Sequence, residues 1–434
     1  IKSIKKYHDK GVRAYEAESS IGWMSKGLGY YLAAKTMWDI KTDAESVKKE
    51  FFKLCFGNAA EEMKKLWQDW ENYSFSSIRP TDLAKWIDRT TAAAKLEQST
   101  AFKKRLFQIR SYLHWLYLYS EYEANKSEAN LLALLSYGYR KLDDGSVSGF
   151  PAVTVLGNPS GFRDMGLVEN PKWKYNTSPV TTEEIDRLIA EDRRKIKVTE
   201  PVKENTLTQK FITVPNIKRF SNLVADSATG DNAFWLTNEW VIEVKSKGAN
   251  SYIDFTGDYI GDVTQKKPIK ISLYRYEADG NVLSQTPLIY YEYTATKIKE
   301  RISLAKLEAG YYSMIIEDPV KIFRFTTSPS VNFSLVMRPH RQANTTAFFY
   351  AFLYVPEGTK KFNVIKSANL ELITPTGRQL TFGKDKAEEA QIDVQKNEAG
   401  LWRIKLMTGK LYVEGIPPYI GTSVSQMLIP ADTK

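Results

Sequence analysis

Proline is distributed very unevenly along this chain, and that distribution limits what the first third can fold into. Of the 17 prolines, only Pro80 precedes residue 151. Proline lacks a backbone N–H and costs about 3 kcal/mol inside a helix, so helical regions exclude it from their interiors. The sequence therefore predicts a helical N-terminal region followed by a region of a different kind.

Apolar residues before position 145 recur at helical spacing. Leu106, Ile109 and Leu113 belong to one such stripe, as expected of an amphipathic helix. Pro80 suits the first position of a helix, where its missing N–H has no intrahelical partner to lose. We expect helices at residues 2–10, 23–38, 43–56, 59–76, 80–95, 98–125 and 127–142.

From about residue 206 the apolar period changes to two. Ile269, Ile271 and Leu273 alternate with more polar positions, and Trp240 and Ile242 show the same spacing. This pattern is typical of half-buried strands. Turn signals recur between these segments without a helix of convincing length, so the sequence favours antiparallel sandwiches over alternating strands and helices.

One phrase occurs twice in the strand-rich region. LEAGYYSMI at residues 307–315 returns as NEAGLWRIK at residues 397–405, each with an acidic turn, Ala-Gly and an aromatic strand. Two tandem modules, each with a tight glycine turn, explain this repeat. The expected fold class is therefore multidomain, α then β. Its expected parts are a helical domain (1–145), a connector (146–205), a first β-sandwich (206–338) and a second β-sandwich (339–434).

The charge pattern gives little support to a nucleic-acid partner. The formal net charge is +10, but lysine and arginine are mixed with acidic residues in every segment. A mixed, solvated surface is the simpler interpretation. No stretch approaches the roughly 20 apolar residues that a membrane-spanning helix needs, so the sequence predicts no transmembrane segment.

The usual templates for metal or nucleophilic chemistry are missing. The single cysteine, Cys55, lies in an apolar run, and His8, His114 and His340 are far apart in sequence. We therefore expect no cofactor and no metal centre, with His114 as a core or interfacial histidine on an aromatic helix. One alternative stays open, because carboxylates at three nearby positions could bind calcium, although without a standard loop spacing: Asp254, Asp258 and Asp262.

The first residues carry the candidate catalytic groups. Residues 12–16 read as a short strand that leads into a helix, so that residues 1–38 resemble one βα unit. Glu16 ends that strand and Glu18 follows it, the position of catalytic carboxylates in a (β/α)₈ barrel. Trp23, Tyr30 and Tyr31 could offer stacking surfaces for sugar rings. The alternative is that both glutamates simply favour the N-terminus of the next helix.

Several motifs resemble those of a known family. They are GVRAYEAE (11–18), GLGYYLAAK (27–35), WD (38–39) and FGNAAEEM (56–63), followed near the other end by FLYVPEGTK (352–360) and GIPPYI (415–420). The first group is similar to the end of the barrel and the helical region of the glycoside-hydrolase-like domain of unknown function 4838. The second group resembles the terminal β-sandwich of such multidomain enzymes.

This resemblance implies a bacterial protein that is secreted, periplasmic or at the cell surface, and that acts on carbohydrate. One βα unit cannot close a barrel, so catalysis would need an upstream barrel domain of the same protein. The expectation is the C-terminal portion of a carbohydrate-active protein that is not catalytic by itself. A non-catalytic carbohydrate-binding module, with Tyr274 and Tyr276 stacking on sugars from the polar phase of their strand, and a purely structural role are the alternatives.

Overall fold

The computed structural model describes residues 2–14, 23–73, 78–96, 99–141, 178–203, 205, 207–214, 233–248, 250–259, 268–278, 286–317, 321–346, 349–367, 369–383 and 388–432. The chain divides into two compact units, residues 1–198 and residues 199–434. The first contains only helices among its described elements, and the second is built from strands. The expected α-then-β fold class is therefore confirmed.

The helical unit contains eight described α-helices and one short 3₁₀ helix. Several begin where the sequence supplies a cap: the side chains of Asp43, Ser127 and Thr181 each accept a hydrogen bond from the backbone N–H three residues later, which satisfies one otherwise unpaired donor. The elements are α1 (Lys2–Asp9), α2 (Trp23–Trp38), α3 (Ala44–Phe56), η1 (Gly57–Ala59), α4 (Ala60–Glu71), α5 (Pro80–Leu96), α6 (Thr100–Ala124), α7 (Glu128–Arg140) and α10 (Thr182–Lys195).

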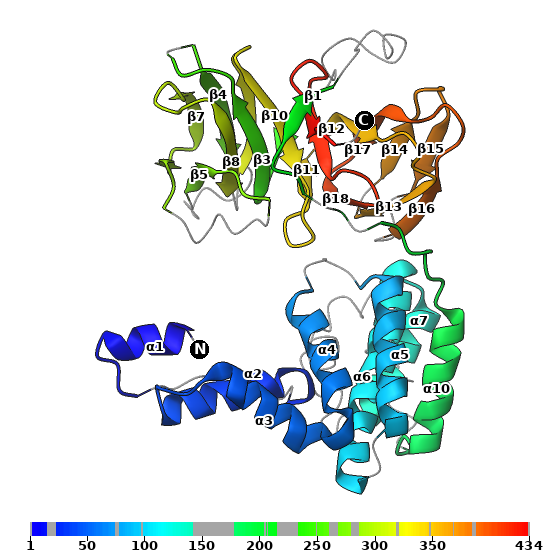
Figure 1. The fold of residues 1–434 in the computed structure, drawn as a ribbon. Coiled ribbons are helices and arrows are strands. Elements are labelled where there is room, and N and C mark those ends of the chain that lie inside the picture. The colour runs from blue at the N-terminus through cyan, green and yellow to red at the C-terminus, as the bar shows by residue number, and fades with distance from the viewer. Residues whose placement is uncertain are drawn as a thin grey trace. The chain divides into compact units, whose positions relative to one another are not determined.

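Helix α6 is the centre of this unit. It packs against α5, α7 and α10, which lie beside it in Figure 1. Met63, Leu66 and Leu113 are fully buried in the shared core, together with Ile185 from α10. Helix α10, which lies in the segment expected to be a connector, thus belongs to the helical core.

The expected βα unit at residues 1–38 is only partly described. Helix α1 is present, and residues 12–14 after it have no regular secondary structure. The remaining two residues of the expected strand, 15 and 16, lie outside the described residues. The helical part that follows, α2, has the bounds that the sequence predicts.

The second unit contains two large antiparallel sheets. The ten-stranded sheet has the order β15-β14-β17-β12-β19-β10-β3-β8-β5-β6, and the eight-stranded sheet has the order β16-β13-β18-β11-β2-β9-β4-β7. Strands β1 and β20 form a separate pair. The strands are β1 (Phe211–Thr213), β2 (Ala233–Phe234), β3 (Asn238–Val244), β4 (Tyr252–Tyr259), β5 (Ile269–Arg275), β6 (Ile289–Tyr293), β7 (Lys297–Ser303), β8 (Gly310–Glu317), β9 (Lys321–Thr327), β10 (Val331–Val336), β11 (Ala343–Thr346), β12 (Phe349–Val355), β13 (Lys361–Lys366), β14 (Leu370–Ile373), β15 (Gln379–Phe382), β16 (Glu388–Asp393), β17 (Gly400–Leu406), β18 (Gly409–Glu414), β19 (Tyr419–Gly421) and β20 (Leu428–Pro430).

The two sheets pack face to face through aromatic side chains. Near one end, Trp240 of β3 lies edge-on to Phe323 of β9, with ring centroids 5.9 Å apart. Near the other end, Trp402 of β17 lies edge-on to Phe362 of β13 at 5.4 Å. Each pair joins one sheet to the other, which is the arrangement of a sandwich.

Both sheets continue across the seam that the sequence placed at residues 338 and 339. Strand β10 pairs with β19, and β2 pairs with β11. Each of these contacts joins a strand before the seam to a strand after it. The two modules therefore share two uninterrupted sheets (Figure 1).

Strand β3 differs from its expected half-buried state. Six of its seven residues are buried, including Val241 on the face opposite Trp240. The pair β1–β20 explains the difference, because Phe211 of β1 and Leu428 of β20 pack over Val241. Strands β1 and β20 are far from β3 in sequence, so the periodicity of β3 alone does not predict that they cover it.

Candidate functional site

An open groove between α2 and α4 is the best candidate for a binding site in the helical unit. Its volume is about 520 Å³, within the range of small-ligand sites. Helix α2 contributes Lys26, Leu28, Gly29 and Tyr30, and helix α4 contributes Trp67, Trp70 and Glu71. An aromatic floor with charged residues at the rim is therefore present on one face of this unit.

The floor of this α2–α4 groove is anchored in the protein core. Leu28 is 3% exposed and Trp67 is 4% exposed, and both belong to the buried cluster of the helical unit. Gly29, between Leu28 and Tyr30, has no side chain, and a Cβ placed there would meet no heavy atom within 4 Å. The glycine thus keeps space open next to the aromatic residues.

Trp70 is held by three other aromatic rings. Its centroid is 5.0 Å from that of Trp67, 6.1 Å from Trp86 and 6.0 Å from Tyr112. The contacts with Trp86 and Tyr112 are edge-to-face and that with Trp67 is tilted, and contacts on several sides fix the orientation of a ring. Trp70 is therefore a rigid part of the groove.

The two tryptophans also carry hydrogen-bond donors that have no partner among the described residues and are closed off from solvent. The Nε1 atoms of Trp67 and Trp70 are enclosed and have no acceptor in the described part of the chain. An enclosed donor without a partner costs about 1–3 kcal/mol. Because neither atom is accessible to solvent, these donors are not available to a ligand in the groove.

Tyr30 and Tyr31 have different environments. Tyr30 lines the α2–α4 groove, whereas the Tyr31 hydroxyl donates to Glu50 Oε1 at 2.7 Å and its ring lies 5.7 Å from Phe51. The hydrogen bond to Glu50 raises the pKa of Tyr31, and the same bond, with one from Lys35, lowers the pKa of Glu50. Tyr31 thus joins α2 to α3 and is not among the described groove residues.

The expected catalytic pair cannot be placed. Glu16 and Glu18 lie outside the described residues, as does the side chain of Trp23. In the possible calcium loop, the side chain of Asp258 and all of Asp262 also lie outside them. The remaining member, Asp254, has both carboxylate oxygens bound by Arg301, at 2.7 and 2.8 Å, so this carboxylate already has a cationic partner.

Tyr274 and Tyr276 do not lie on a solvent-facing strip. Each is only 7% exposed. Tyr276 packs beside Phe211, with ring centroids 5.3 Å apart, and its hydroxyl is 3.1 Å from that of Tyr419. Tyr274 packs against Ile315 of the neighbouring strand. The expectation that these rings face solvent was wrong, because Phe211 of β1 and Tyr419 of β19 pack on Tyr276, while Ile315 of β8 packs beside Tyr274.

Trp67 and Trp70 are the groove residues that the sequence did not single out. They stand three residues apart on α4, so they share one face of the helix. The same spacing is typical of a helix face that packs in the core, and both indoles do pack partly against the core. Only the opposing glycine and Tyr30 of α2 distinguish a groove wall from an ordinary core contact.

His114 is buried, as a core histidine is expected to be. Its Nδ1 lies 2.6 Å from Oδ2 of Asp192, so the pair ties α6 to α10. Burial raises the pKa of Asp192, against the opposing effect of the hydrogen bond from His114. A smaller groove of about 310 Å³ lies beside this pair.

The described residues contain neither a metal-binding cluster nor a membrane-spanning helix. Within the described ranges, no group of three or more His, Cys, Asp or Glu residues is arranged to hold a metal ion. None of the described helices combines the length and apolar character that crossing a membrane requires.

The chain matches no protein-family model and no curated protein. Among solved structures it is similar to the insecticidal delta-endotoxin Cry8Ea1 from Bacillus thuringiensis, at 8% identity over 95% of this chain and 97% of that chain, with a TM-score of 0.17. A likeness this low supports no argument about fold or function.

Proposed function

We propose that this chain belongs to a secreted, glycoside-hydrolase-like bacterial protein and that its helical unit binds carbohydrate in the α2–α4 groove. The observation that carries the proposal is the groove itself, with Tyr30 on one helix and a fixed Trp67–Trp70 pair on the other. The sequence motifs around residues 11–63, which resemble that family, support the same class of ligand.

The chemistry of the groove suits a sugar. Aromatic ring faces stack on the C–H faces of pyranose rings, and the hydroxyl oxygens of a sugar accept hydrogen bonds. Lys26 and Glu71 at the rim add polar groups that can contact further hydroxyls.

The binding proposal is tested by filling the groove without damaging the fold. Gly29→Leu adds a side chain where there is free space and replaces a helical glycine, which favours the helix by up to about 1 kcal/mol. We expect it to abolish binding of soluble oligosaccharides by isothermal titration calorimetry. Ala34→Leu, at an exposed site on the same helix, is the matched control and should bind normally.

A second pair of variants tests the aromatic contact. Tyr30→Ala should weaken binding by about tenfold, the effect of losing one stacking contact. Trp38→Ala removes a larger ring that is 93% exposed on α2 and should leave binding unchanged. If Trp38→Ala weakens binding while Gly29→Leu and Tyr30→Ala do not, the sugar binds elsewhere and the groove assignment is wrong.

The enzymatic part of the proposal concerns Glu16 and Glu18. Because a single βα unit provides no closed barrel, we expect this chain to bind oligosaccharide without cleaving it. Release of reducing ends is the measurement. Cleavage that Glu16→Gln or Glu18→Gln abolishes would show instead that these residues form a working active site.

A further inference from the structure

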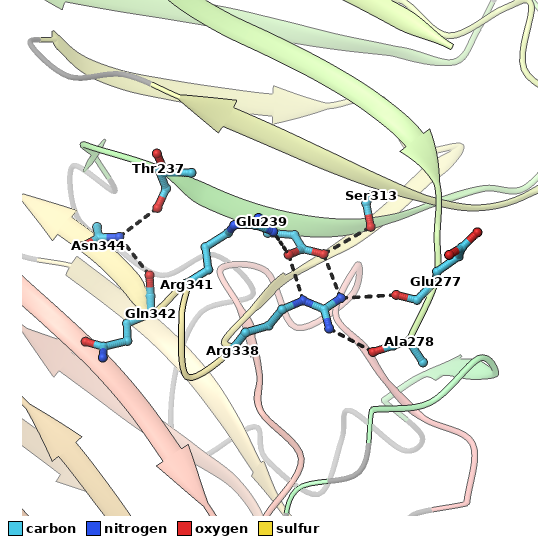
Figure 2. A network of polar contacts seen from close by, with 9 residues as sticks. All are labelled: Thr237, Glu239, Glu277, Ala278, Ser313, Arg338, Arg341, Gln342 and Asn344. Atoms are coloured by element: carbon cyan, nitrogen blue, oxygen red, sulfur yellow. Dashed lines mark hydrogen bonds and ion pairs between the residues drawn. The ribbon is translucent and has the colours of Figure 1, made fainter. Parts of the chain in front are cut away.

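A buried cluster of charges lies where the strands of the two sandwich modules meet. Glu239 of β3 is 0% exposed and contacts two arginines, Arg338 and Arg341 (Figure 2). The arginines flank the turn Pro339-His340 and pair with each other through their backbones, Arg338 N to Arg341 O at 2.9 Å and the reverse at 3.0 Å. Directly paired residues share one face of a strand pair, so both guanidinium groups reach the same carboxylate.

Arg338 uses nearly all of its hydrogen-bonding capacity. Its Nε and Nη2 donate to the two oxygens of Glu239 at 2.9 and 3.0 Å, and Nη1 donates to Ala278 O at 2.9 Å. Nη2 also reaches Glu277 O at 3.3 Å. Figure 2 shows this guanidinium enclosed by its acceptors. No ligand is needed to explain Arg338.

Arg341 is different. Its Nη1 donates to Glu239, but Nε and Nη2 have no acceptor among the described residues, and neither belongs to the enclosed, unpaired atoms. The residue is nevertheless only 8% exposed. Arg341 therefore presents a small, fixed edge of donors to solvent from an otherwise buried side chain.

The charges of the cluster do not cancel. One carboxylate, Glu239, faces two guanidinium groups, so the three side chains together carry one excess positive charge. Partial burial and the positive charges of Arg341 and Arg338 lower the pKa of His340 at the tip of the turn, against the opposing effect of Glu239. The environment of the turn thus favours an anion.

We infer that Arg341 binds the carboxylate of an acidic saccharide, a uronic acid, at the turn formed by residues 338–341. The inference rests on the proposed carbohydrate function for the identity of the ligand, and on the excess charge and unused donors of Arg341 for the site. The planar guanidinium edge matches the two oxygens of a carboxylate. The site lies in the β unit and is separate from the α2–α4 groove.

The test titrates the chain with sodium glucuronate, with glucose and with sodium sulfate at equal ionic strength. Binding is monitored by the NMR signal of the His340 imidazole. Glucuronate should shift the His340 signal in a saturable manner and raise its pKa, because a bound anion offsets the nearby arginines. His340→Gln identifies the signal among the three histidines of the chain. Glucose should cause no change.

Arg341→Gln is the decisive variant, because it removes the excess charge and leaves the Glu239–Arg338 pair in place. It should weaken glucuronate binding by about tenfold or more, whereas Arg341→Lys, which keeps the charge but not the planar fork, should have an intermediate effect. If Arg341→Gln fails to fold, the Arg341→Lys result and the glucuronate titration of the unaltered chain still decide the question. Equal binding of sulfate and glucuronate would mean a general anion site and overturn the uronate assignment.

The outcomes separate this inference from the proposed function. Suppose that neutral oligosaccharide binding depends on Gly29 and Tyr30, but glucuronate does not affect the His340 signal. That result overturns the Arg341 site alone. If glucuronate binds but Gly29→Leu does not change the binding of neutral sugars, the α2–α4 groove alone is overturned as a binding site.

Discussion

The repeated phrase in the two halves of the β unit gives the same glycine conformation and the same aromatic contact, but a different environment for the glutamate side chain. In both copies the glycine before the strand has a positive φ, 151° at Gly310 and 127° at Gly400, a conformation that other residues rarely adopt. In both copies an aromatic side chain donates back to the glutamate carbonyl four residues earlier. Tyr312 Oη reaches Glu308 O at 2.8 Å, and Trp402 Nε1 reaches Glu398 O at 2.6 Å.

The glutamate side chains of the two copies differ. Glu308 is exposed and pairs with Lys247 at the surface. The side chain of Glu398 is 1% exposed and accepts hydrogen bonds from Arg378 Nε at 2.7 Å and from the backbone N–H of Gln395 at 2.8 Å. The repeated sequence therefore preserves the glycine conformation and the aromatic contact, while the neighbouring residues decide whether the glutamate side chain is buried.

The shared aromatic contact should give the largest effects. Tyr312 is 1% exposed and Trp402 is 0% exposed, so Tyr312→Ala and Trp402→Ala should each lower the free energy of unfolding by about 3–5 kcal/mol. Urea denaturation measures both. Losses that differ by more than about twofold would show that the two copies are not equivalent in their cores.

Replacing the glutamate should change the free energy of unfolding by different amounts in the two copies. Glu398→Gln leaves Arg378 without its carboxylate partner, and we expect a loss of about 2–3 kcal/mol, less than for a fully enclosed pair because Arg378 reaches solvent. Glu308→Gln is the matched control, and an exposed pair of this kind should change stability by no more than about 0.5 kcal/mol. Equal effects in urea denaturation would remove the contrast between the copies.

The pH dependence of stability should also distinguish Glu398 from Glu308, with a smaller effect than the substitutions above. Burial alone would raise the pKa of Glu398, but the hydrogen bonds from Arg378 and Gln395 outweigh it and lower that pKa. A carboxylate with a lowered pKa in the folded state stabilises the protein above its unfolded pKa, about 4.3. That contribution is lost as the pH falls through the folded-state pKa.

The same measurement on the variants isolates Glu398. Between pH 6 and pH 3, in thermal unfolding experiments, Glu398→Gln should show a shallower decline in stability than the unaltered chain. Glu308→Gln, the matched control, should follow the unaltered chain. Parallel curves for Glu398→Gln and the unaltered chain would contradict the assignment of this carboxylate as a buried acceptor.

The sequence predicted those features that depend on neighbouring residues. Pro80 begins α5 as expected, because the effect of a proline at the first position of a helix lies within one helical turn. The period-two segments after residue 206 became strands. Tyr30 was identified as a candidate stacking residue, and it lines the groove.

Features that depend on distant segments were missed. Tyr276 and Val241 looked exposed or half-buried from their own strands, but Phe211 and Leu428 cover them. Trp67 and Trp70 were not identified, since nothing on α4 shows that Gly29 of α2 leaves space beside them. The periodicity of a segment indicates which of its residues share a face. It does not indicate which distant residues pack against that face.

The strand pairings β10–β19 and β2–β11 have a consequence for how this unit unfolds. A chain cut between residues 338 and 339 would also break the β1–β20 pair and would leave six strand edges with unpaired backbone N–H and C=O groups, and such edges promote self-association. Neither half should then be stable alone. The two halves should unfold in a single cooperative transition, so that any force or damage applied to one half is transmitted directly to the other.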